Sequence, residues 1–178
     1  MNADELRSVQ TPLKERYRDS PESALVTLEA QGRIGDGVTC KVGTGKGFIE
    51  AGLHPATGGN GTWACSGDML LEALAACAGV TLAAAATAIG VEIQAGVVRA
   101  EGDLDFRGTL GVSKDVPVGF QRIRLHFDLT TDASEEQLAT LLRLTERSCV
   151  VYQTLRHSPE MTVSRRVMPT ASEVVPET

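Results

Sequence analysis

The feature of this 178-residue chain that most constrains its fold is a long segment without charged side chains. Residues 73–91 contain no Asp, Glu, Lys or Arg, and alanine is their commonest residue. Ser66, a predicted N-cap, and Asp68, an acid suited to a first helical turn, precede the segment, and Gly90 supplies a stop signal. This pattern predicts one helix from residue 66 to about residue 89. Because the helix is apolar nearly all round, we expect it to be buried on every side.

A segment of this length must be weighed against a membrane span. It is mostly Ala, Gly and Thr, with few of the larger apolar residues that make insertion favourable, and its flanking charges, Glu72 and Glu92, are acidic. We therefore interpret it as the buried central helix of a globular domain, which the apolar fraction of 42% also favours. One chain of this size has trouble covering such a helix completely, and this favours a homodimer.

The balance of charge excludes two classes of partner. The net charge is −6 and no basic run occurs, whereas nucleic acids and anionic membrane surfaces need clustered Lys and Arg. Residues 1–7 include acids and lack the apolar core of a signal peptide, so we expect a cytoplasmic protein. In a reducing compartment its four cysteines are more often catalytic or metal-binding than structural disulfides.

The sequence contains no recognisable motif for a metal or an organic cofactor. It has no Cys-x-x-Cys pair, no His at zinc-like spacing from a Cys, no dinucleotide fingerprint and no nucleophile elbow. We therefore expect neither a metal nor a cofactor.

The remaining segments predict an α+β fold with a mostly antiparallel sheet around the long helix. Residues 120–130 show the cleanest alternation, with apolar side chains facing one way and Arg, His and Asp the other. Residues 134–137 form a capping-box signature for a second, amphipathic helix that ends near Cys149. Further strands are predicted at residues 24–34, 38–42, 47–53, 91–106 and 161–167, with a hairpin turn at residues 35–37 and a bulge at Gly96.

These elements divide the chain into three parts. Residues 1–23 are predicted to form a helical N-terminal arm that is interrupted at Thr11 and Pro12. Residues 24–168 form the domain, and residues 169–178 a flexible tail rich in Pro, Thr and Glu.

Cys77, in the middle of the long apolar helix, is the first candidate for chemistry. Its small neighbours (Ala73, Ala76 and Ala78) leave room around the sulfur, although a cysteine in an alanine-rich helix can equally be a packing residue. Burial raises the pKa of a thiol, so a reactive Cys77 needs a cationic or hydrogen-bonding partner. Arg33, at the end of a predicted strand, can supply the cation; its alternative role is that of a solvated hairpin residue.

Cys149 is the second candidate. It closes the second predicted helix, where the helix dipole disfavours a thiolate, so it suits a resolving thiol better than a first nucleophile. The alternative is a residue of the apolar stripe of that helix. Cys40 and Cys65 have no clear partners, and we interpret them as incidental.

Three stretches, in the same order, resemble the OsmC/Ohr family of cysteine-based hydroperoxide reductases. The first is residues 32–37 (Gly-Arg-Ile-Gly-Asp-Gly), similar to the family's Gly-Arg hairpin. The second is the glycine-rich loop 58–61 leading to residues 68–77, similar to the family's acidic residue, Leu and Ala run and first cysteine. The third is residues 135–155, similar to the second cysteine motif. The resemblance covers residues 24–168, which would form an OsmC-like domain.

The resemblance implies an intertwined homodimer with two long central helices enclosed by sheets and a site at the subunit interface. In that site Cys77 would be the peroxidatic cysteine and Cys149 the resolving one. Arg33 would stabilise the thiolate and orient the peroxide. The family's carboxylate that holds this arginine matches Asp68 better than Glu72.

The activity implied by the resemblance is reduction of organic hydroperoxides to alcohols. It would proceed through a Cys77 sulfenic acid and a Cys77–Cys149 disulfide, which an external dithiol reduces. The alternative is a non-catalytic dimer of the same fold that binds a small lipophilic ligand at the interface pocket. The chain differs from the family pattern at Val150, where the family usually has Pro, and at residues 67–68, where Gly-Asp replaces the usual Pro-Glu.

Overall fold

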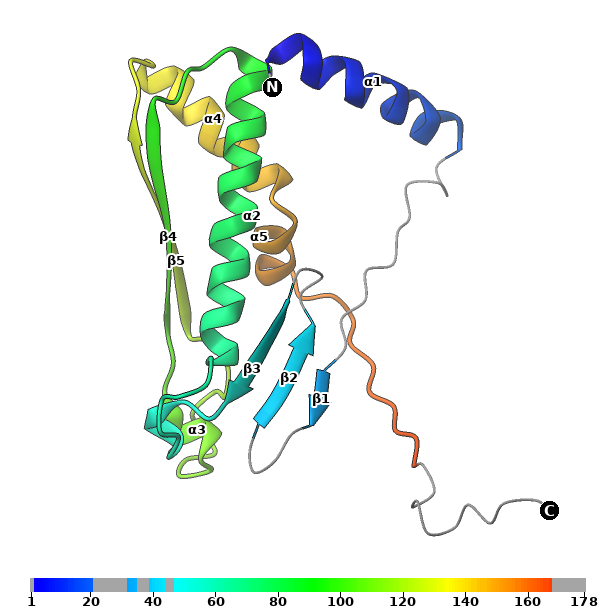
Figure 1. Ribbon diagram of the computed structural model, residues 1–178. Coiled ribbons are helices and arrows are strands. Elements are labelled where there is room, and N and C mark those ends of the chain that lie inside the picture. Colours follow the sequence, from blue (N-terminus) through cyan, green and yellow to red (C-terminus); the bar gives the residue numbers. More distant parts are fainter. Residues whose placement is uncertain (1, 21–31, 35–38, 44–46, 168–178) are drawn as a thin grey trace, which may run out of the picture.

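A computed structural model describes residues 2–20, 32–34, 39–43 and 47–167 (Figure 1). Its helices are α1 (Ala3–Asp19), the 3-10 helix η2 (Pro55–Thr57), α2 (Ser66–Ile89), α3 (Phe106–Thr109), α4 (Glu135–Ser148) and α5 (Val150–Arg156). Its strands are β1 (Gly32–Ile34), β2 (Thr39–Gly43), β3 (Phe48–Gly52), β4 (Ala95–Asp103) and β5 (Arg122–Thr130). They form two antiparallel sheets, β1-β2-β3 and β4-β5. The predicted α+β fold with a long central helix is confirmed.

The central helix α2 begins one residue earlier than its predicted cap implies. Cys65, not Ser66, is the N-cap, and its side chain makes no capping hydrogen bond. Gly90 ends the helix as predicted, because its left-handed backbone (φ 71°) lets its N–H bond to the carbonyl of Ala86.

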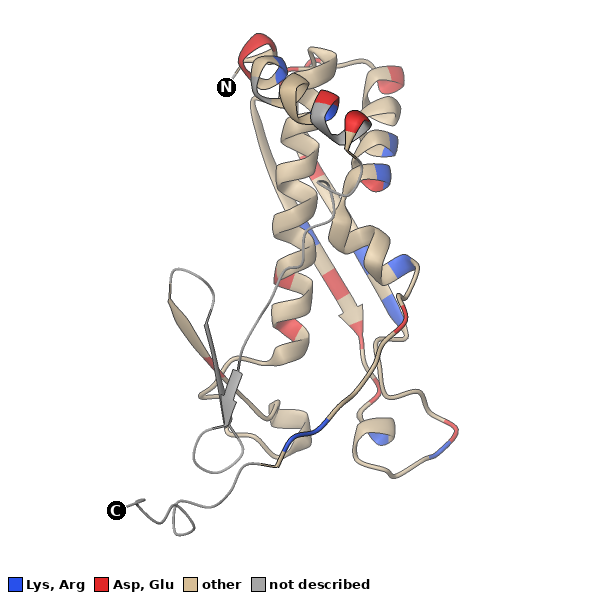
Figure 2. Cartoon of the chain, turned by 90° about the vertical axis from the view of Figure 1, so that its right-hand side faces the viewer, with Lys and Arg blue, Asp and Glu red and all other residues tan. Residues whose placement is uncertain are grey.

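Only one face of α2 is buried within the chain. Leu74, Ala78, Leu82 and Ala86 recur at every fourth residue and form the buried stripe. On the opposite side Val80 is 73% exposed. Figure 2 shows that the charges of α2 are confined to its N-terminal end, so most of this exposed surface is apolar. Burial on every side is thus not reached within a single chain: β4, α4 and α5 pack on the helix and α1 also contacts it, but Val80 stays exposed.

The β4–β5 ribbon covers the buried side of α2. Its nine pairs run without a break from Ala95–Thr130 to Asp103–Arg122, so the predicted bulge at Gly96 is wrong. Gly96 serves close packing instead, because a Cβ there would lie 2.9 Å from Cδ2 of Leu129. On the inner face of the ribbon, Phe127 and Leu129 pack against the main core, which includes Leu82 of α2 and Leu141 of α4.

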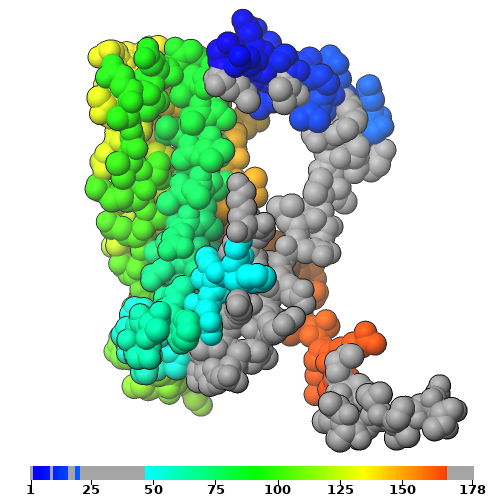
Figure 3. All heavy atoms as spheres, in the orientation of Figure 1, coloured from blue at the N-terminus to red at the C-terminus, as the bar shows by residue number. Residues whose placement is uncertain are grey.

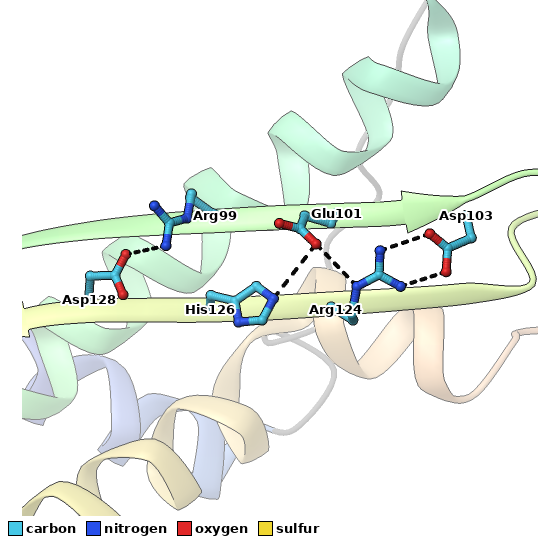
Figure 4. A network of polar contacts seen from close by, with 6 residues as sticks. All are labelled: Arg99, Glu101, Asp103, Arg124, His126 and Asp128. Atoms are coloured by element: carbon cyan, nitrogen blue, oxygen red, sulfur yellow. Dashed lines mark hydrogen bonds and ion pairs between the residues drawn. The ribbon is translucent and has the colours of Figure 1, made fainter.

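The outer face of the ribbon carries a ladder of charges (Figure 4). Arg124 bonds both Glu101 and Asp103 on the opposite strand, and the hydrogen bonds from Arg124 hold the pKa of Asp103 below its ordinary value. Arg99 pairs with Asp128 at 2.6 Å. Pairs this exposed contribute little to stability, but they mark this face as the one that meets water.

Three predicted elements differ in extent. The strand predicted at residues 91–106 is shorter, because Asp105 accepts the N–H of Arg107 and starts α3 at Phe106. The arm helix α1 is not interrupted and continues through Pro12. Residues 161–167 form no strand: they are exposed, and no neighbouring strand is available to them within the described part of the chain. The residues predicted as a strand at 24–31, as the turn at 35–37 and as the tail at 169–178 lie outside the described residues.

Leu141 should be a stability determinant, because it is fully buried between α2 and the ribbon. We expect Leu141→Ala to lower the free energy of unfolding by about 2–5 kcal/mol through lost burial and a cavity. Leu110→Ala, at a side chain that is 55% exposed, should change it by less than about 0.5 kcal/mol. Urea denaturation of both variants checks this, and equal losses would contradict the assignment of the core.

Candidate active site at the Cys77–Cys149 pair

Three helices bring Cys77 and Cys149 into contact. Cys77 lies in the middle of α2, and Cys149 joins α4 to α5 as the C-cap of the first and the N-cap of the second. The Cys149 side chain is within hydrogen-bonding reach of Cys77, and both are free thiols. Cys149 is 1% exposed, whereas Cys77 is half-buried. The more accessible sulfur is therefore that of Cys77.

The chain turns at Cys149 without losing its backbone hydrogen bonds. The N–H of Cys149 donates to Thr145, and its carbonyl accepts from Gln153, each at 2.9 Å. The carbonyl of Glu146, which a continuous helix would pair with the N–H of Val150, instead accepts the side-chain amide of Gln153 at 2.7 Å. The N–H groups at the start of α5 therefore point to other acceptors.

The Cys77 sulfur receives these donors. Burial raises the pKa of Cys77, but hydrogen bonds from the N–H of Val151, the thiol of Cys149 and the N–H of Val150 together outweigh that effect. The Thr81 hydroxyl lies within reach of both the carbonyl and the sulfur of Cys77, and its contact with the sulfur also lowers the pKa of Cys77. The pKa of Cys77 therefore lies below its ordinary value, and the thiolate is favoured.

The pKa of Cys149 is shifted in the opposite direction, above its ordinary value. Burial raises its pKa, and the neighbouring Cys77 raises it further, against the N–H groups of Tyr152 and Val151. The two effects describe one arrangement, in which the Cys149 thiol donates a hydrogen bond to a Cys77 thiolate. Ionisation of the pair is therefore easier at Cys77 than at Cys149.

Cys149 lies at the end of one helix and at the start of another, which differs from the prediction. We expected only a helix C-terminus, whose dipole disfavours a thiolate, but Cys149 also begins α5. The donors at Val150 and Val151 were not predicted, because every residue type except proline carries a backbone N–H and no pattern marks a kink. Thr81 could have been found, since it lies one helical turn after Cys77.

The other predicted site residues are not brought to the pair. Asp68 and Glu72 are exposed on the first turns of α2, and Asp68 is roughly 14 Å along the helix from Cys77. The backbone of Arg33 pairs with Lys41 in the β1–β2 ladder, and its side chain lies outside the described residues. The contact of Arg33 with a carboxylate or with Cys77 stays a prediction.

A cavity of about 290 Å³ lies between α2, β5 and α5, and neither cysteine of the pair lines it. Leu74 lines it from α2, one turn before the position of Cys77, and Tyr152 and Leu155 line it from α5. Strand β5 closes it with Ile123 and Leu125. Its lining is mixed, because Gln121, Arg122 and Arg156 also belong to it. Within the described ranges no cluster of His, Cys, Asp and Glu side chains is suited to hold a metal ion.

Comparisons with known proteins agree with this architecture. A sequence model described as OsmC-like protein matches residues 59–164. The fold is similar to that of an OsmC-like protein from Mycoplasma pneumoniae, at 17% identity and a TM-score of 0.64, covering 75% of this chain and 89% of that one.

Two further structures carry more specific names. An organic hydroperoxide resistance protein OsmC from Legionella pneumophila is 17% identical, with a TM-score of 0.59 and coverage of 75% and 91%. The organic hydroperoxide resistance protein OhrB of Bacillus subtilis is 20% identical, with a TM-score of 0.51 and coverage of 75% and 93%. No curated protein sequence matches the chain significantly.

Replacing Val150 by proline should test the donors at the turn. Proline is accepted at the first position of a helix, and Cys149 already has the extended backbone (φ −73°, ψ 109°) that a following proline requires. The Val150 side chain is 69% exposed, so little packing is lost. We expect Val150→Pro to raise the pKa of Cys77, because one N–H donor is removed.

The measurement is a pH titration of the ultraviolet absorbance of the thiolate. Val150→Ala keeps the N–H and should leave the pKa of Cys77 unchanged. If Val150→Pro titrates like the native protein, the N–H of Val150 does not act on the sulfur.

Proposed function

This chain belongs to the OsmC-like protein family, whose sequence model matches more than half of it, and we propose that it is a thiol-dependent peroxidase that reduces organic hydroperoxides to alcohols. The observation that carries the proposal is the contact between Cys77 and Cys149, with the pKa of Cys77 lowered and that of Cys149 raised. Structural neighbours named as organic hydroperoxide resistance proteins support it.

The reaction follows from the two protonation states. The Cys77 thiolate attacks the distal oxygen of the hydroperoxide, so an S–O bond forms, the O–O bond breaks and the leaving alkoxide takes a proton to become the alcohol. Cys77 is then a sulfenic acid. The Cys149 sulfur attacks it, water leaves, and a disulfide forms. An external dithiol reduces the disulfide and restores both thiols, so each turnover consumes two electrons from that dithiol.

The proposal keeps the roles that the resemblance assigns to the remaining residues. Arg33 would orient the peroxide, with Asp68 as its carboxylate partner. Such a cycle suits a reducing compartment such as the cytoplasm, where dithiols are available.

A homodimer is part of this proposal. The exposed side of α2 includes Leu70, Val80 and several alanines, and Figure 3 shows this helix uncovered along most of its length on one face. A contiguous apolar surface of this kind marks an association site. A second copy of the chain would cover it and would bring its own sheets to the site.

The peroxidase cycle is tested by consumption of cumene hydroperoxide with a dithiol. We expect turnover by the native protein, none by Cys77→Ser, and in Cys149→Ser a single reaction that leaves a sulfenic acid which dimedone traps. Cys65→Ser should behave like the native protein, since Cys65 lies at the far N-terminal end of α2. Absence of turnover with both thiols unreactive would leave the non-catalytic ligand-binding dimer.

The dimer is tested by sedimentation equilibrium. The native protein should sediment at twice the chain mass of 18.9 kDa, and Val80→Glu should shift it toward the monomer by placing a charge on the contact face. Val118→Glu, at a valine that is also largely exposed but lies in the loop before β5, should leave the mass unchanged. A monomeric native protein would refute this part of the proposal.

A further inference from the structure

The turn between α4 and α5 separates several N–H groups and carbonyls from their helical partners. In a continuous helix the N–H groups of Val150, Val151 and Tyr152 would donate to the carbonyls four residues earlier, those of residues 146–148. The extended backbone of Cys149 (φ −73°, ψ 109°) breaks this pattern, although Cys149 itself keeps both of its helical hydrogen bonds. The freed backbone groups therefore need other partners.

The freed N–H groups donate to the two sulfurs. Val150 and Val151 donate to Cys77, and Tyr152 together with Val151 donates to Cys149. The two thiols thus accept from all three N–H groups that the turn releases. A straight helix would withdraw these donors from the sulfurs, because each N–H would return to a carbonyl of α4.

The freed carbonyl of Glu146 is bonded by a side chain of α5. Nε2 of Gln153 donates to this carbonyl at 2.7 Å. Helical side chains tilt toward the N-terminus of their helix, so the side chain of Gln153 extends back past the turn toward α4. The amide therefore occupies the acceptor to which the N–H of Val150 would return in a straight helix.

Neighbouring polar side chains do not share this contact. An open hollow of about 390 Å³ is lined by Gln153 and also by Arg147, Thr154 and His157. Within the described part of the chain, none of the other three donates to the Glu146 carbonyl. The contact between the two helices at this carbonyl therefore depends on Gln153.

We propose that Gln153 is a positioning residue for Cys77. Its amide bonds the Glu146 carbonyl, and this contact keeps the turn between α4 and α5 open. The N–H of Val150 is thereby left free to donate to the Cys77 sulfur. Gln153 acts through the backbone of the turn and not on the sulfur itself. Its effect on the thiol is independent of the proposed peroxidase activity, whereas its effect on turnover rests on that proposed function.

Alkylation of Cys77 by iodoacetamide, followed by mass spectrometry of the peptide that contains it, tests the role of Gln153 directly. Gln153→Met keeps the length of the side chain and a high helix propensity but removes the donor. At a pH below the pKa of Cys77, alkylation should be about threefold to tenfold slower in this variant, because a hydrogen bond to the thiolate is lost. Thr154→Ala, in the same hollow, keeps the amide and should react like the native protein. An unchanged rate in Gln153→Met, as when water replaces the amide at the carbonyl, would overturn the proposal.

A double variant separates this role from a general loosening of the turn. Val150→Pro has no N–H at that position, and its proline also disfavours a helical backbone at Cys149, so the Glu146 carbonyl has no donor to recapture. When Val150→Pro is already present, Gln153→Met should therefore slow alkylation further by less than about twofold. Equal slowing in both backgrounds would show that Gln153 only supports packing, and would refute the proposal.

The pH profile of turnover links the inference to the proposed function. At neutral pH, kcat/KM for cumene hydroperoxide should be lower in Gln153→Met than in the native protein. It should approach the native value once the pH exceeds the pKa of Cys77 in the variant, where the thiolate forms without the donor. Native turnover without such a shift would keep the peroxidase and refute this inference. Slower alkylation in Gln153→Met without any native turnover would refute the peroxidase and keep the positioning role.

Discussion

The sulfur of Cys77 lies on an apolar helix, and its ionised form depends on donors that another element must bring to it. Burial alone would raise the pKa of Cys77 above its ordinary value. The turn at Cys149 reverses this outcome, because it ends α4, starts α5 and directs N–H groups of Val150 and Val151 at the sulfur. The same turn places the Cys149 thiol against Cys77. One change of backbone direction therefore lowers the pKa of Cys77 and also brings a second thiol to it.

The rest of the fold serves to hold α2 and α5 against each other. The β4–β5 ribbon and α4 pack on the buried stripe of α2, with Leu141 at the centre of the contact. The ribbon shows its charge ladder to water, whereas α2 shows an apolar surface on its other side. The molecule thus has one charged face that suits contact with water and one apolar face that a single chain leaves exposed.

Local signals predicted much of this fold and only part of the site. Short stretches of sequence are enough to predict the extent of α2, the alternation of β5 and the capping box at Ser134. The structure confirms all three. The strand expected at residues 161–167 failed because alternation describes a side-chain pattern, while a strand also needs a neighbour to bond. The two cysteines were identified by residue type. Their backbone donors were not, since these depend on how α5 is oriented.

The anchored backbone of Cys149 has a kinetic consequence. Its N–H and carbonyl are both engaged in helical hydrogen bonds, so the residue is held in place and only its side chain is free to rotate. A thiol fixed beside its target acts at a high effective molarity, because the entropy of bringing the two groups together has been lost already on folding. In the proposed cycle this shortens the lifetime of the sulfenic acid at Cys77. A short lifetime leaves little time for a second peroxide to carry that sulfur on to the irreversible sulfinic state.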